Sequence, residues 1–113
     1  MNQISIYRGD DDERLITFTD SDDVAIDITG WKIYFTVKKD KDDSDDDALI
    51  TKDWTSHTDP TEGETTLSLS DSDTDIDPGM YICDIQVKKA DLSIKTVVVM
   101  PFEVHTDITR RIS

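Results

Sequence analysis

The chain has 113 residues and a formal net charge of −14, with 26 acidic residues against 12 lysines and arginines. This negative charge argues against a nucleic-acid partner and against anionic membranes, because both repel an acidic surface. No apolar run approaches the roughly 20 residues that a membrane-spanning helix needs, and the N-terminal residues carry no signal-peptide pattern. The single Cys83 excludes an internal disulfide, so we expect the protein to fold in a reducing cytoplasm.

The length fits one domain, residues 1–113. Hydrophobic residues make up only 35% of the chain, so the core should be thin and should gain stability from a partner, from oligomerisation or from the ionic conditions. Asp strongly outnumbers Glu, and Asp disfavours helix interiors while favouring turns. The acidity suits a loop-rich β protein, and it equally suits a protein adapted to high salt, where self-repulsion is screened.

Alternation of apolar and polar residues predicts β-strands along most of the chain. Polar turns separate these strands, and no segment has a convincing helical pattern. An acidic loop at 39–47, a second polar loop at 56–63 and a tail at 106–113 are expected outside them. Pro101 suggests an edge position or a bulge. The predicted strands are 4–7, 15–19, 24–28, 31–38, 48–54, 65–69, 80–88 and a last strand over 93–104 that Pro101 breaks.

Two of these strands have the clearest pattern. In 31–38 every second residue from Trp31 to Val37 is apolar, and we place this strand beside 80–88 in the core. The 80–88 strand follows a Pro-Gly turn, and Tyr81 precedes the small Cys83 by two residues. This order is typical of a central strand in an immunoglobulin-like sandwich. We therefore predict an all-β, immunoglobulin-like antiparallel β-sandwich of seven to nine short strands, without significant helix.

The segment 71–77 carries acids at alternate positions, as calcium-binding loops do. It fails the EF-hand pattern, because isoleucine stands both where the loop needs its glycine and where it needs its bidentate glutamate. A solvated turn is the favoured interpretation, and an irregular calcium site between loops stays open. The four candidate ligands are Asp71, Asp73, Asp75 and Asp77.

Nothing in the sequence indicates an enzyme. His57 and His105 do not stand in a spacing that would recruit zinc together with Cys83. Cys83 lies on the predicted core face, where a cysteine is a small buried hydrophobe rather than a nucleophile. No glycine-rich phosphate loop or nucleophile elbow is present. We predict no catalytic residues, no metal site and no cofactor, with calcium left open.

Several segments, taken in order, resemble one family. They are Gly9-Asp10, Ile26-Asp27-Ile28-Thr29-Gly30-Trp31, Pro78-Gly79-Met80-Tyr81-Ile82-Cys83-Asp84-Ile85 and Phe102-Glu103-Val104. Their order is similar to that in small immunoglobulin-like structural proteins of tailed phages and prophages, and to the N-terminal domain of phage baseplate upper proteins. The resemblance covers nearly the whole chain. The sequence departs from the family pattern at Cys83, where an aromatic residue is more common.

The resemblance implies a non-enzymatic structural component of a virion, made in the host cytoplasm, that docks in the tail or baseplate or on the capsid. Its partners would be other virion structural proteins, and it would work as a homo-oligomer in a symmetric assembly. The family offers no active site to carry over to this sequence. The extreme acidity departs from the family and would suit a virus of a salt-loving host.

We expect partner contacts at the edges of the predicted sheets, where a neighbour's strand can be added. The first and the last predicted strands are the candidate edges, and two arginines in the tail can face an acidic neighbour. The residues concerned are Ile4 and Ile6 in the first strand, the last strand over 93–104, and Arg110 and Arg111 in the tail.

An alternative function is a loop-based binding module for a host-surface glycan or for calcium. Trp54 follows a predicted strand and precedes a polar loop. An exposed aromatic residue in that place can anchor a partner, and a buried one can cap an end of the core. The sequence leaves both interpretations of Trp54 open, and in the binding module Trp54 and the 71–77 loop would make the contacts.

Overall fold

The computed structural model describes residues 3–40 and 48–106. Seven strands and a single-turn 3₁₀ helix, Pro60–Glu62, make up the regular structure of these residues. The predicted all-β sandwich is confirmed, and the predicted polar loop at 56–63 contains the 3₁₀ turn. The strands are β1 (Ile4–Tyr7), β2 (Asp12–Thr17), β3 (Lys32–Lys38), β4 (Ile50–Trp54), β5 (Glu64–Leu69), β6 (Gly79–Lys88) and β7 (Ile94–His105).

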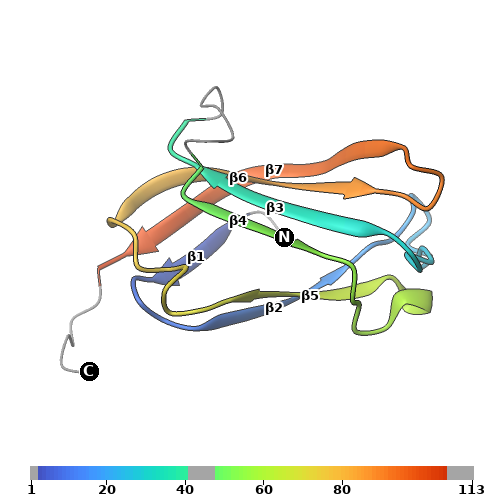
Figure 1. The fold of residues 1–113 in the computed structure, drawn as a ribbon, viewed down its shortest axis with the longest axis horizontal. Helices are drawn as coiled ribbons and strands as arrows, with labels where there is room; N and C mark the ends of the chain where they lie inside the picture. The colour runs from blue at the N-terminus through green and yellow to red at the C-terminus, as the bar shows by residue number, and fades with distance from the viewer. Residues whose placement is uncertain (1–2, 41–47, 107–113) are drawn as a thin grey trace.

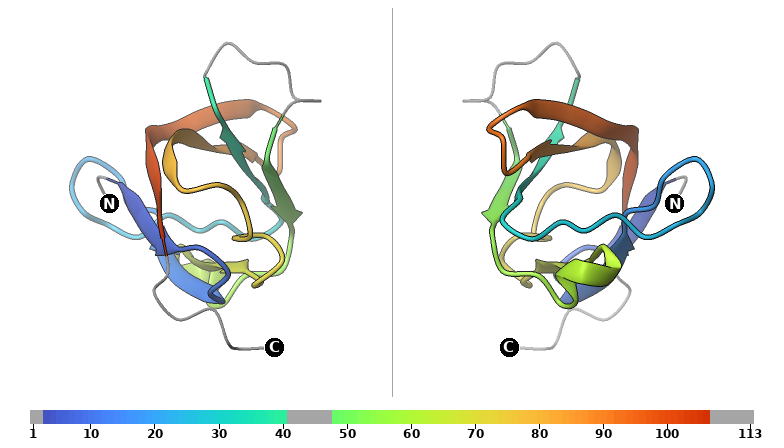
Figure 2. Two further views of the ribbon diagram at one scale, coloured as in Figure 1. Left: turned by 90° about the vertical axis from the view of Figure 1, so that its left-hand side faces the viewer. Right: turned by 90° about the vertical axis from the view of Figure 1, so that its right-hand side faces the viewer.

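The strands form two layers (Figures 1 and 2). The larger sheet has the order β1-β7-β6-β3-β4, and β2 and β5 form a two-stranded antiparallel sheet that covers its inner face. The expectation of a purely antiparallel sandwich is wrong at one place, because β1 pairs with β7 in parallel. This pairing is possible because β1 and β7 are the first and last strands, so no tight hairpin has to join them.

The core lies between the two layers and depends on the pairing of β3 with β6. Their register sets Phe35 opposite Ile85 and Val37 opposite Cys83, which confirms that these two strands are neighbours. Phe35 also contacts Phe102 of β7, with 6.1 Å between the ring centroids. Alternate residues of each strand therefore enclose one continuous apolar cluster.

Tyr81 ties the start of β6 to the turn before it. Its hydroxyl donates a hydrogen bond to the main-chain carbonyl of Asp77. Burial raises the pKa of Tyr81, and the negative charge of Asp77 adds to the effect. A tyrosine bonded back to the chain in this way is a feature of immunoglobulin-like domains, and the assignment to that group stays a prediction.

The predicted strand at 24–28 is not a strand. Ala25 forms only an isolated bridge with Thr19, and β2 begins at Asp12 and ends at Thr17 instead of covering 15–19. The carboxylate of Asp20 accepts hydrogen bonds from the main-chain N–H groups of Asp22 and Val24. Aspartate side chains that bond the backbone in this way compete with a strand ladder, so the segment turns instead of pairing.

The break predicted at Pro101 is also wrong, since β7 continues through it. A bulge does occur, four residues earlier, where Ile85 and Gln86 of β6 face Val98 and Thr96 and leave Val97 unpaired. Pro101 lies opposite Ile82, immediately before the part of β7 that pairs with β1. The predicted edge position of Pro101 is therefore confirmed, because the pairing of β1 with β7 begins only at Phe102.

A pair of leucine truncations tests where the core lies. Leu67 of β5 is fully buried and lies opposite Arg14 of β2. Leu15, the next residue of β2, is exposed. We expect Leu67→Ala to lower the free energy of unfolding by about 2–5 kcal/mol, because it leaves a cavity. Leu15→Ala should cost about 0.5 kcal/mol or less. Urea denaturation followed by circular dichroism measures both, and equal losses would contradict the assigned layers.

Candidate interaction surface

Side chains bridge the flank of the sandwich where β1 meets β2. Arg14 of β2 donates from Nη2 to the main-chain carbonyl of Ser5 in β1 at 2.8 Å. Its Nε is held by the carboxylate of Asp12 at 2.7 Å. The outer edge of β1 therefore has one of its acceptors already bonded within the molecule, which makes it a poor place for a neighbour's strand.

The opposite flank, between β4 and β5, is bridged as well. The indole N–H of Trp54 donates to the hydroxyl of Thr65 at 2.7 Å. His57 extends this network, with Nε2 2.8 Å from the carbonyl oxygen of Trp31 and Nδ1 3.0 Å from the Thr65 hydroxyl. Since a carbonyl only accepts, Nε2 is the donor. His57 therefore has a structural role that its loop position in the sequence did not reveal.

The sequence-predicted partner residues are not brought together. Ile4 and Ile6 are buried, so their side chains belong to the core, whereas the side chain of Tyr7 in the same strand is exposed. Trp54 is half-buried, packs against the core and lies on β4, at the other edge of the same sheet. Arg110 and Arg111 lie outside the described residues.

The acidic residues of the 71–77 loop bond to different neighbours and do not converge. Asp75 pairs with Arg8 at 3.0 Å. Asp73 is 2.7 Å from the ammonium of Lys52. Partial burial acts to raise the pKa of Asp73, but Lys52 and the Ser70 donors outweigh it and hold that pKa below the usual value. Across residues 3–40 and 48–106, no three His, Cys, Asp or Glu side chains are grouped so as to hold a metal ion.

Cys83 lies on the core face of β6 and is buried. Burial raises the pKa of its thiol to about 12, with a further contribution from the charge of Asp84. The thiol therefore stays protonated at neutral pH, and a protonated, buried thiol is a poor nucleophile and a poor metal ligand.

The first part of β7 lies at an edge of the larger sheet. β1 pairs with residues Phe102–His105 alone, so the segment Ile94–Pro101 pairs with β6 on one side and, within the described residues, with no strand on the other. Ile94, Val97 and Val99 are exposed in this segment. A run of valines gives no clear alternation, so the sequence could not assign their faces.

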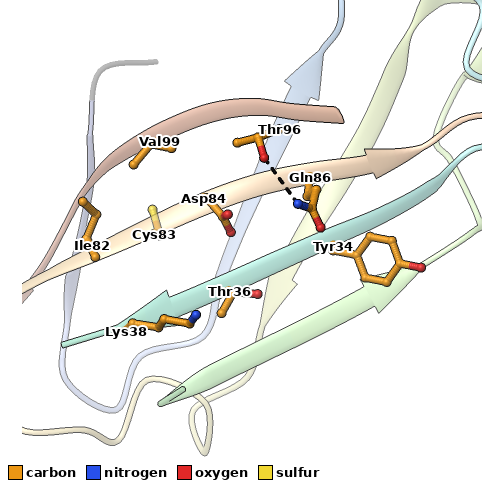
Figure 3. A pocket seen from close by; sticks show the side chains of 9 residues that line it. All are labelled: Tyr34, Thr36, Lys38, Ile82, Cys83, Asp84, Gln86, Thr96 and Val99. Atoms are coloured by element: carbon orange, nitrogen blue, oxygen red, sulfur yellow. Dashed lines mark hydrogen bonds between the residues drawn. The ribbon is translucent and has the colours of Figure 1, made fainter. Parts of the chain in front are cut away.

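The outer face of the larger sheet is hollowed beside this free edge (Figure 3). The hollow has a volume of about 580 Å³ and lies over β3, β6 and β7. Gln86 and Thr96 are hydrogen-bonded across it at 3.3 Å. Most of the residues around it are polar, and its two aliphatic residues are Ile82 of β6 and Val99 of β7. The residues around it are Tyr34, Thr36, Lys38, Ile82, Cys83, Asp84, Gln86, Thr96 and Val99.

These features define a small all-β sandwich protein with a bridged flank on each side and an exposed edge along the first part of β7. The chain belongs to the family of the BppU N-terminal domain, whose family model matches residues 1–112. The resemblance to the N-terminal domain of phage baseplate upper proteins is thereby confirmed. A comparison with curated proteins found no significant match.

Family membership indicates a structural role in a phage tail or baseplate. It implies that the protein is a component of the virion and interacts with other virion components. Within the described residues, no helix is both long enough and apolar enough to cross a membrane.

A charge-removing substitution tests the internal role of the 71–77 loop. Because the pKa of Asp73 is lowered in the folded protein, its stabilising effect is present above the unfolded value of 3.8 and is lost as the pH falls through the folded pKa. We expect Asp73→Asn to lower the free energy of unfolding at pH 7 by about 1 kcal/mol or less, and this loss to shrink as the pH is lowered below 3.8. Asp71→Asn is the control, and an equal loss there would contradict the assignment.

Proposed function

We propose that the protein is a non-enzymatic, immunoglobulin-like docking domain of a phage tail or baseplate. The single observation that supports this most is the family match over residues 1–112. The buried, protonated Cys83 and the separated carboxylates of the 71–77 loop agree with a structural role rather than a catalytic one. The exposed aliphatic residues of β7 offer a surface for a neighbouring protein.

In this proposal the domain is made in the host cytoplasm, is incorporated into the virion and works in several copies within a symmetric assembly. Its partners are other structural proteins and copies of itself. The net charge of −14 supports contacts with proteins rather than with nucleic acid or anionic lipid. A surface of this charge also stays soluble at high salt, where its self-repulsion is screened.

The virion location can be tested directly. We expect mass spectrometry of density-purified phage particles to detect the protein, and antibodies raised against it to label the tail or the baseplate in electron micrographs. Labelling of the capsid would show that the domain docks on the capsid instead of the tail or baseplate. Absence of the protein from intact particles would contradict the proposal. An antibody against the major capsid protein is the matched control for labelling.

A loop-based calcium or glycan module is the weaker proposal, because Trp54 packs against the core and Asp73 and Asp75 already pair with Lys52 and Arg8. We expect millimolar calcium to release no heat in a calorimetric titration and to leave the melting temperature unchanged within about 1 °C. Magnesium at equal ionic strength is the control. A calcium-specific rise in melting temperature would restore the calcium-binding alternative.

A further inference from the structure

We draw no further inference here: the strongest candidate, the hollow over β3, β6 and β7 together with the exposed side chains of the first part of β7 beside it, carries no proposal because nothing in the structure shows what covers it.

Discussion

The structure depends above all on the antiparallel pairing of β3 with β6. This pairing places the apolar side chains of both strands on one face, and β7 adds Phe102 to the same face through its own pairing with β6. A sequence with few hydrophobic residues can form a core only if nearly all of them meet in one layer. The smaller sheet then needs to contribute only a few residues, such as Leu67 and Ile16, to close the cluster.

The thin core explains why polar side chains bridge the flanks. Two sheets of unequal width leave their outer strands incompletely covered, and a buried polar group without a partner would be costly there. Arg14, Trp54 and His57 meet this requirement by bonding from one layer to the other. In the part of the chain that the structure describes, no buried side-chain nitrogen or oxygen lacks a hydrogen-bond partner. The first part of β7 extends beyond β1 and, within the described residues, pairs with no strand on its outer side.

Several of the acidic side chains are paired with cations within the molecule. Asp73 and Asp75 of the 71–77 loop pair with Lys52 and Arg8, and the β6–β7 hairpin, where Lys89 lies over the ring of Trp31, is at the other end of the molecule.

The sequence by itself determined the all-β class, the β3–β6 pairing and the burial of Cys83, because alternation of apolar residues is a local signal. It misassigned 24–28, because the bonds of the Asp20 side chain that turn the chain there leave no trace in hydropathy. Only the tertiary structure decided that β1 pairs in parallel, that Trp54 turns toward Thr65 and that β7 keeps a free edge. Each of these depends on contacts between residues far apart in the chain, and local pattern does not specify such contacts.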